Sequence, residues 1–381
     1  MSGRKFISKQ VIFRFLAVAG SFIVAIGIAE LILKVIPVYI GRHSDMFNFI
    51  EYDSTLGWKV KPDLNTVINF SDVENVPFRT NSLGLRDKEF PIERTPGRCR
   101  IVVLGDSFTW GLGVKAEDRF TGILEKEHPE WEVFNFGVPA YGTDQELLLW
   151  EKHARFYQPD LVILSLYSND YDDNLFEVLY GRRKPYYEFD DKSRLVLKGV
   201  PVDKTIFWDD GIFKQVAPAY VHFYSEPVKK RLRLEYYLAK SSSLCRLIYT
   251  LVRDRDRTGY LGSQTCAKDM KELSPDMQIQ TRLLSAIVIK LAEEVKNSGA
   301  DFLVVFIGRA MENFAVQKQI FDAAGINYVE AITENLILRS GKDVDQIYYP
   351  YNKHFTLLGN KLLAELLNDW FNIHNFCRRH N

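Results

Sequence analysis

The chain has 381 residues, and its 49 lysine and arginine residues balance 49 aspartate and glutamate residues. This neutral net charge removes the electrostatic argument for nucleic-acid binding, which depends on excess positive charge. The length fits two domains or one elaborated α/β domain. The four cysteines lack the paired C-x-x-C spacing of a zinc site, and only Cys245 and Cys266 are close enough in sequence to suggest a local disulfide. Whether these two pair stays open.

The amino terminus is typical of an exported protein. Its first acidic residue is Glu30, and four basic residues come before it: Arg4, Lys5, Lys9 and Arg14. The mostly apolar stretch from Val11 to Leu33 is longer than the roughly 20 residues that a membrane helix needs. We therefore expect an uncleaved transmembrane anchor in residues 1–36, a cytoplasmic amino terminus and a main domain on the periplasmic or extracellular side. The alternatives are a cleaved signal peptide, which Ala17-Val18-Ala19 suggests, and a buried soluble helix.

The main domain shows an α/β pattern. Residues 37–98, which contain Pro62 and Pro77, lack clear periodicity and form either an irregular stalk or a layer packed on this domain. From Ile101 an apolar run leads into Gly105-Asp106-Ser107, as in a buried parallel strand. Further strands are expected at 132–136, 161–166, 302–307 and 326–329, with helices between them. The pattern predicts a flavodoxin-like three-layer α/β/α domain with a parallel sheet over residues 99–375.

The alternation of strands and helices breaks between residues 171 and 273. Within this insertion, residues 194–197 favour a hairpin and residues 232–253 favour a helix. The insertion either shapes the functional site or is a packing appendage. Its aromatic residues Tyr186, Tyr187 and Phe189 could stack on a sugar, although such residues more often belong to a core.

Polar residues with catalytic chemistry follow three of the predicted strands. Ser107 comes after the first strand, Gly137 after the second and Asn169 after the third. The carboxyl ends of parallel strands meet at one edge of a sheet, so these residues are expected close together. A serine nucleophile needs oxyanion donors and a base. Backbone N–H groups and the Asn169 amide are suitable donors, and His354, before the last predicted helix, is the candidate base.

Competing motifs are weaker. No Gly-x-Ser-x-Gly elbow surrounds Ser107. Residues 111–116 mimic a dinucleotide fingerprint but begin six residues after the predicted strand end rather than in the first turn. Paired acids without other ligand types are expected to be solvated: Asp172, Asp173, Asp209 and Asp210. We therefore expect neither a metal nor another cofactor.

The order of these residues resembles the conserved blocks of the SGNH hydrolases, also called the GDSL family. The first block stands as Gly105-Asp106-Ser107, and the second as Asn135-Phe136-Gly137. The third stands as Tyr167-Ser168-Asn169-Asp170, with a tyrosine in place of the family's leading glycine. The last block holds His354, but Asn352 and Tyr351 stand where the family has an aspartate. The resemblance covers residues 99–375 without the insertion, and it extends to bacterial single-pass members.

The resemblance implies the SGNH hydrolase fold and an acyl-serine mechanism. In that mechanism Ser107 is the nucleophile and an oxyanion donor, Gly137 and Asn169 are further donors, and His354 is the base. We predict a membrane-anchored serine esterase or O-acyltransferase that acts on acyl esters, acetyl esters foremost, of cell-envelope glycan or lipid. The alternative is a catalytically impaired envelope protein that binds glycan or a protein partner.

The absence of the family's aspartate leaves the orientation of His354 open. In a triad the acid fixes the histidine tautomer and stabilises the imidazolium. Asn352 can orient the ring through a hydrogen bond, but it supplies no negative charge. A backbone carbonyl can act in the same way, or a distant acid such as Asp343 or Asp345 can reach the ring. Loss of hydrolysis is the fourth alternative.

Overall fold

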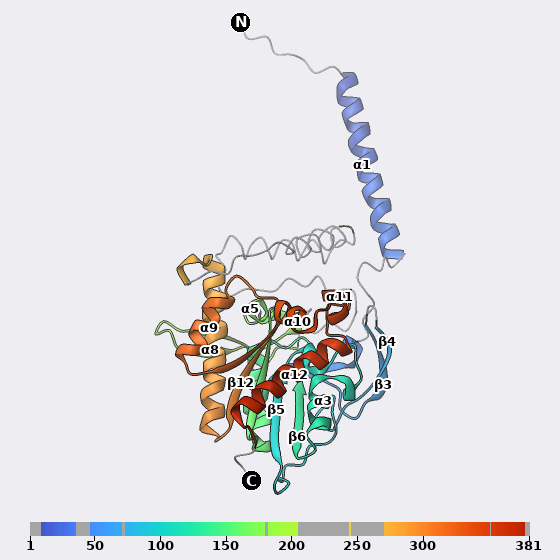
Figure 1. Ribbon diagram of the computed structural model, residues 1–381. Helices are drawn as coiled ribbons and strands as arrows, with labels where there is room; N and C mark the ends of the chain where they lie inside the picture. Colours follow the sequence, from blue (N-terminus) through green and yellow to red (C-terminus); the bar gives the residue numbers. More distant parts are fainter. Residues whose placement is uncertain are drawn as a thin grey trace.

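The computed structural model describes residues 9–35, 46–70, 73–179, 182–204, 244, 270–350 and 352–377. Its centre is a parallel five-stranded sheet in the order β13-β12-β7-β5-β6 (Figure 1). The strands are β5 (Cys99–Gly105), β6 (Trp131–Gly137), β7 (Leu161–Tyr167), β12 (Asp301–Gly308) and β13 (Asn327–Ile332). Each predicted strand overlaps one of them, which confirms the expected parallel sheet.

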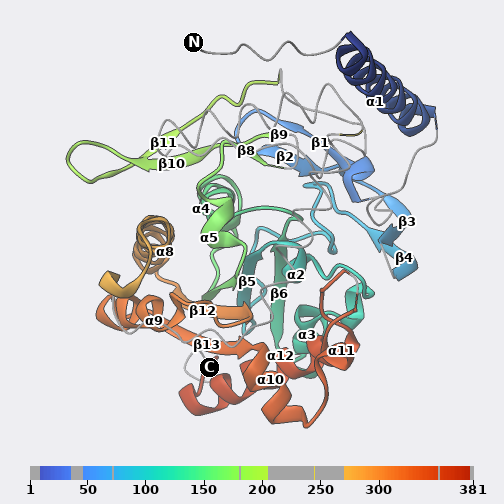
Figure 2. The same cartoon turned by 90° about the horizontal axis from the view of Figure 1, so that it is seen from above.

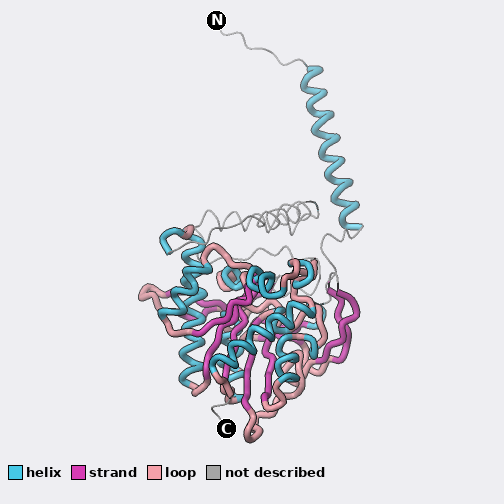
Figure 3. Tube along the Cα trace, in the orientation of Figure 1, coloured by secondary structure: helices cyan, strands magenta, loops and turns pink. Residues whose placement is uncertain are grey.

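Helices cover both faces of this sheet (Figures 2 and 3). Residues of β5 alternate between the faces, because Val102 and Leu104 belong to one hydrophobic cluster and Ile101 and Val103 to the other. The first cluster includes side chains of α4 (Thr143–Lys152), α8 (Pro275–Asn297) and α9 (Phe314–Ala323). The second includes side chains of α3 (Phe120–Glu127), α10 (Thr333–Ser340) and α12 (Leu357–His374). Burial on both faces explains why the strand is an unbroken apolar run.

Two short helices follow strands of the sheet: α2 (Ser107–Trp110) and α5 (Asp170–Asp173). A third, α11 (Val344–Ile347), precedes α12. α2 follows β5 directly, and α5 begins three residues after β7 ends. The long helix α8 begins as the sequence predicts. Ser274 Oγ accepts a hydrogen bond from the Met277 N–H at 3.3 Å, and Pro275 is the first helical residue.

The segment before the sheet is a packed layer rather than a stalk in its described residues, 46–70 and 73–98. Two antiparallel hairpins form it: β1 (Ile50–Asp53) with β2 (Gly57–Val60), and β3 (Asn65–Phe70) with β4 (Val73–Arg79). Trp58 is 1 % exposed, and its ring lies 5.8 Å from that of Tyr141. Buried Arg86 donates hydrogen bonds of 2.7 Å to the carbonyls of Gly111 and Val114. The hairpins are short and mixed in polarity, so the sequence showed little periodicity.

Two small hairpins follow α5 in the described part of the insertion. β8 (Val178–Leu179) pairs with β9 (Arg182–Arg183), and β10 (Tyr186–Phe189) pairs with β11 (Leu195–Lys198). The second hairpin confirms the hairpin expected at residues 194–197. Tyr187 is 3 % exposed and belongs to the hydrophobic cluster beside α4 and α8, so it is a core residue. The helix expected at 232–253 lies, apart from Leu244, outside the described residues.

Helix α1 (Lys9–Val35) projects from the α/β domain (Figure 1). Large apolar side chains along it are exposed, including Phe13, Phe22 and Ile23. Within the described residues, however, no helix meets both the length and the apolar character needed for a membrane crossing. This finding differs from the expectation of a transmembrane anchor in residues 1–36.

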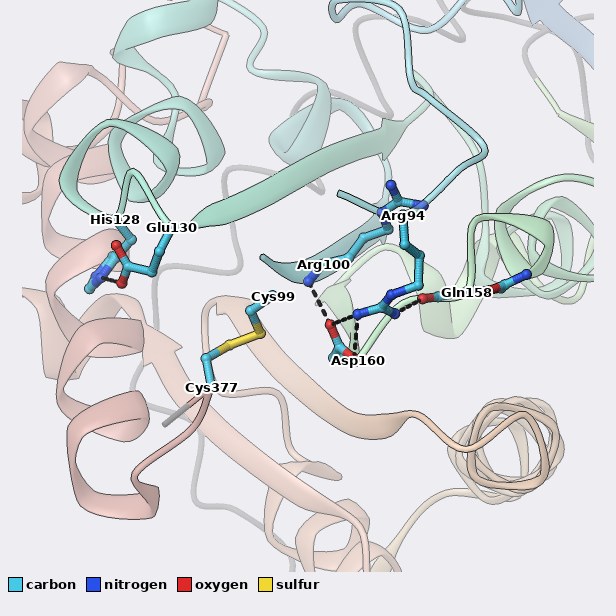
Figure 4. The surroundings of a disulfide bond; sticks show 8 residues. All are labelled: Arg94, Cys99, Arg100, His128, Glu130, Gln158, Asp160 and Cys377. Carbon is cyan, nitrogen blue, oxygen red and sulfur yellow. Dashed lines mark hydrogen bonds and ion pairs between the residues drawn. A yellow bond between two sulfur atoms is a disulfide. The ribbon is translucent and has the colours of Figure 1, made fainter. Parts of the chain in front are cut away.

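A disulfide joins Cys99 to Cys377, 278 positions apart (Figure 4). Cys99 opens β5, and Cys377 lies three residues beyond the end of α12. Beside the disulfide, the Asp160 carboxylate accepts hydrogen bonds from the Arg94 side chain at 2.7 and 2.9 Å and from the Arg100 backbone N–H at 2.7 Å. The pair could not be found from sequence spacing, because the fold alone brings its members together. Cys245 and Cys266 lie outside the described residues.

We predict that the Cys99→Ser/Cys377→Ser double variant is less stable than the wild-type protein by about 2–5 kcal/mol, because the cross-link restricts a very long loop in the unfolded chain. Urea unfolding under non-reducing conditions measures the difference. A Cys245→Ser/Cys266→Ser variant controls for the other two cysteines. Equal midpoints for the wild-type protein and the Cys99→Ser/Cys377→Ser variant would contradict the prediction.

Candidate active site

Ser107 stands where β5 ends and α2 begins. Asp106 caps the helix through a 2.8 Å hydrogen bond from the Phe108 N–H to its carboxylate. The turn before it requires glycine, because a Cβ on Gly105 would lie 2.2 Å from Thr109 Oγ1. The apolar strand and this tight turn together hold Ser107 at the carboxyl edge of the sheet.

The structure brings His354 to Ser107. His354 lies in the loop between α11 and α12, and its Nε2 is 2.8 Å from Ser107 Oγ. An isolated bridge between Tyr348 and Phe355 holds the ends of this loop together. The two predicted catalytic residues, 247 positions apart, thus form a hydrogen-bonded pair. This distance suits proton transfer from a serine hydroxyl to an imidazole.

The second nitrogen of His354 faces a backbone carbonyl. Nδ1 lies 2.9 Å from the carbonyl oxygen of Asn352. The Asn352 side chain binds the backbone instead of the ring, because its Oδ1 accepts a hydrogen bond from the backbone N–H of His354 at 2.8 Å. Of the predicted alternatives, this geometry fits the backbone carbonyl. Asp343 instead caps α11, and Asp345 lies in the first turn of that helix.

Aromatic rings contact the His354 imidazole from two parts of the chain. Phe108, on α2, lies 4.8 Å away at an interplanar angle of 30°. Phe70, at the end of β3, lies 5.7 Å away at 86°. Phe70 belongs to the layer before the sheet, so sequence reasoning missed it. Its contact shows that this layer contributes to the surroundings of the base.

The three predicted oxyanion donors differ in their surroundings. Ser107 is the first residue of α2, where a backbone N–H has no partner within the helix. The Gly137 N–H, however, donates to Asn135 Oδ1 at 2.9 Å, so that donor is occupied in this structure. Asn169 Nδ2 donates to Asp173 Oδ2 at 2.6 Å. An amide nitrogen carries two hydrogens, and the Asn169 side chain also interacts with the buried Asp106 carboxyl group.

Five buried carboxyl groups lie in and beside the segments that carry Ser107 and Asn169: Asp106, Asp144, Glu146, Asp170 and Asp173. Burial raises the pKa of Asp106 to about 7 and that of Asp173 to about 8. Interactions with the Ser107 and Asn169 side chains partly oppose the shift of Asp106. The expectation that Asp173 is solvated was wrong, because Asp173 is buried at the end of the short helix α5.

One buried cation faces this group of acids. Lys184, 1 % exposed, forms an ion pair with Asp144. It comes from the segment between β9 and β10, so the insertion supplies a charge to the interior beneath the site. Glu146 has no exposed surface, and neither of its carboxylate oxygens has a hydrogen-bond partner among the described residues. Burial and the nearby carboxylates of Asp170, Asp106 and Asp144 raise its pKa far above the usual value.

No protein-family model matches this sequence, and no curated protein matches it. Solved structures do. One is a lipase/acylhydrolase from Enterococcus faecalis, 11 % identical, covering 72 % of this chain and 96 % of its own, with a TM-score of 0.38. A lipolytic protein of the G-D-S-L family from Veillonella parvula is 11 % identical, covering 72 % and 98 %, with a TM-score of 0.36. An acetylxylan esterase from Geobacillus stearothermophilus is 11 % identical, covering 72 % and 95 %, with a TM-score of 0.36.

Each of these proteins is similar to the chain in fold alone. The Veillonella protein carries the name of the family that the sequence blocks resemble. At such low identities and TM-scores the similarity says nothing about the reaction. The chemistry is therefore argued from the contacts of Ser107 and His354.

The buried acids predict how stability depends on pH. A carboxyl group whose pKa is raised in the folded state stabilises the protein fully below its unfolded pKa, near 4, and this contribution is lost as pH rises through the folded pKa. Asp106 and Asp173 place that loss between about pH 4 and pH 8. Glu146 is another buried acid with a raised pKa, and glutamine at its position cannot ionise. We therefore expect the melting temperature of Glu146→Gln to fall less than that of the wild-type protein between pH 5 and pH 8. Thermal unfolding at several pH values measures this, and parallel curves would refute it.

Proposed function

We propose that the protein is a serine esterase or O-acyltransferase of the SGNH type that works through an acyl-serine intermediate. The 2.8 Å contact between Ser107 Oγ and His354 Nε2 carries this proposal. His354 takes the hydroxyl proton as Oγ attacks the ester carbonyl carbon. The same proton then passes to the leaving alcohol as the C–O bond breaks. Water or a second hydroxyl group repeats these steps on the acyl-enzyme, so hydrolysis and transfer use the same residues.

The oxyanion formed in each step needs hydrogen-bond donors. The Ser107 N–H at the start of α2 and the hydrogen of the Asn169 amide that is not bonded to Asp173 are the donors that the described contacts favour, the latter once it turns from the Asp106 carboxyl group to the oxyanion. Gly137 becomes a third donor only when its N–H leaves Asn135 Oδ1.

A neutral carbonyl behind His354 is compatible with catalysis. A carbonyl oxygen can only accept, so Nδ1 carries the proton and Nε2 is left free to accept the proton of Ser107. In a triad, an Asp→Asn change that imposes the wrong tautomer lowers kcat by about 10⁴-fold. The Asn352 carbonyl avoids that loss, but it supplies no charge to stabilise the imidazolium. We therefore place the protein among serine-histidine dyad enzymes.

Two observations favour a non-catalytic protein that binds glycan or a protein partner as the second candidate. His354 Nδ1 lies 2.9 Å from the neutral carbonyl oxygen of Asn352, where a triad places a carboxylate, and the Gly137 N–H is occupied. Covalent labelling of the serine separates the two candidates.

We predict that a fluorophosphonate probe labels Ser107 in the wild-type protein, because the probe reacts with a serine that a base has activated. Ser107→Ala should remove labelling and the hydrolysis of p-nitrophenyl acetate. His354→Ala should lower kcat by at least about 10³-fold, because the base is lost. Absence of labelling in folded wild-type protein would overturn the enzyme proposal and leave the binding protein.

Asn352→Asp is the matched variant at the loop. Its carboxylate can still accept the His354 backbone N–H, as Asn352 Oδ1 does, so we expect kcat within about tenfold of wild type. A gain of a hundredfold or more would show that the side chain, rather than the backbone carbonyl, faces Nδ1.

We further propose that the domain works on the exported side of a membrane, where α1 holds it, and that its substrates are acyl esters of envelope glycan or lipid, acetyl esters foremost. The Cys99–Cys377 disulfide supports an oxidising compartment. The basic residues before α1 and the exposed apolar side chains on that helix support membrane attachment.

The location is tested with an alkaline-phosphatase fusion at the carboxyl terminus, because this reporter is active only after export. We predict an active reporter in the membrane fraction. Substitution of Phe13, Phe22 and Ile23 by serine should release the protein from that fraction. An inactive reporter would contradict the proposed side of the membrane.

A further inference from the structure

The orientation of the Asn169 amide depends on buried acids, Asp173 foremost and Asp106 beside it. Asn169 Nδ2 donates to Asp173 Oδ2 at 2.6 Å, whereas Asn169 Oδ1 has no hydrogen-bond partner among the described residues. The amide oxygen therefore does not decide which way the amide is turned. If the amide were flipped, its oxygen would face the Asp173 carboxyl group and present an acceptor, instead of a donor, to the site.

Asp173 is itself held firmly. It is the last residue of α5, four positions after Asn169, and is 5 % exposed. Its backbone N–H donates to the Asn169 carbonyl at 2.8 Å. The next residue, Asn174, accepts the Asp144 N–H at 2.9 Å through Oδ1, and Asp144 forms the ion pair with Lys184. This chain of contacts links α5 to α4 and to the insertion.

Resting on the proposed esterase function, we propose that Asp173 is a positioning residue that holds the Asn169 amide with its nitrogen toward the substrate oxyanion. One amide hydrogen bonds to Asp173, and the other then points away from it. The role differs from that of a catalytic residue, because Asp173 acts only through Asn169. It also gives the insertion a function, since Lys184 supports the helix that carries Asp173.

The proposal predicts a coupling that simple loss of packing would not give. Loss of an oxyanion donor lowers kcat by about 10²–10³-fold, so Asn169→Ala should show a loss of that order. Asp173→Ala should lower kcat about tenfold or more with little change in KM, since the amide can then flip. In the Asn169→Ala background, Asp173→Ala should change kcat less than about twofold, because its only route of action is gone.

Two further variants complement this double-mutant cycle of Asn169→Ala and Asp173→Ala. Asp173→Asn keeps an acceptor oxygen and should retain much more activity than Asp173→Ala. Asp172→Asn is the control. Asp172 is exposed, its carboxylate accepts from Gln280 Nε2 at 2.6 Å, and its charge acts on Asp173. Asp172→Asn therefore changes the charge near Asp173 without removing the acceptor of the Asn169 amide, and it should leave kcat unchanged. Circular dichroism and thermal unfolding establish that each variant folds. If Asp173→Ala does not fold, Asp173→Ser, whose hydroxyl is too short to reach Asn169, replaces it in the cycle.

The outcomes separate the inference from the proposed function. An unlabelled, inactive wild-type protein would overturn the esterase proposal itself. An active wild-type protein in which Asp173→Ala matches wild type would overturn only the role of Asp173. The same holds if Asp173→Ala costs as much in the Asn169→Ala background as in wild type, because the residue would then act through the fold in general.

Discussion

The hydrogen bond between Ser107 and His354 depends on the register of the parallel sheet. β5 is buried on both faces, so sliding it would disrupt the packing of its side chains in both hydrophobic clusters. Its end fixes Ser107, and the adjacent strand β7 fixes Asn169 at the same edge. His354 is brought to that edge by the loop before α12, whose apolar face packs against the sheet. A small displacement of any of these elements would break the contact between the nucleophile and its base.

The interior behind this edge is unusually rich in acids. Five buried carboxyl groups and one buried lysine occupy a region that ordinary packing would fill with apolar side chains. Such groups are tolerated because the raised pKa values of Asp106 and Asp173 allow them to be neutral over part of the physiological range. Asp106 caps the helix that begins at Ser107, and Asp173 binds the Asn169 amide. The acids thus order the backbone and side chains of the site while their burial lowers its stability at alkaline pH.

The features that could be predicted are those that a short stretch of sequence, or the order of motifs along the chain, reveals. The central strands were found because runs such as Ile101 to Leu104 are apolar throughout, and Ser107 and His354 because their order along the chain matches a known pattern. The burial of Asp173 could not be predicted, since it depends on how α5 packs. Likewise, the sequence alone could not show that Asn135 occupies the Gly137 N–H, that the backbone of Asn352 faces the histidine, or that Phe70 reaches it. Each of these contacts is set by tertiary structure.

The disulfide and the catalytic pair lie at opposite ends of the same two elements. β5 has Cys99 at its start and Ser107 just past its end, whereas α12 follows His354 and leads to Cys377. A single cut of the backbone anywhere between Ser107 and His354, for instance within the insertion, would place nucleophile and base on different fragments. Those fragments would still be covalently joined through Cys99 and Cys377. The protein can therefore tolerate nicking by proteases as a two-chain molecule, provided that the two fragments stay folded together.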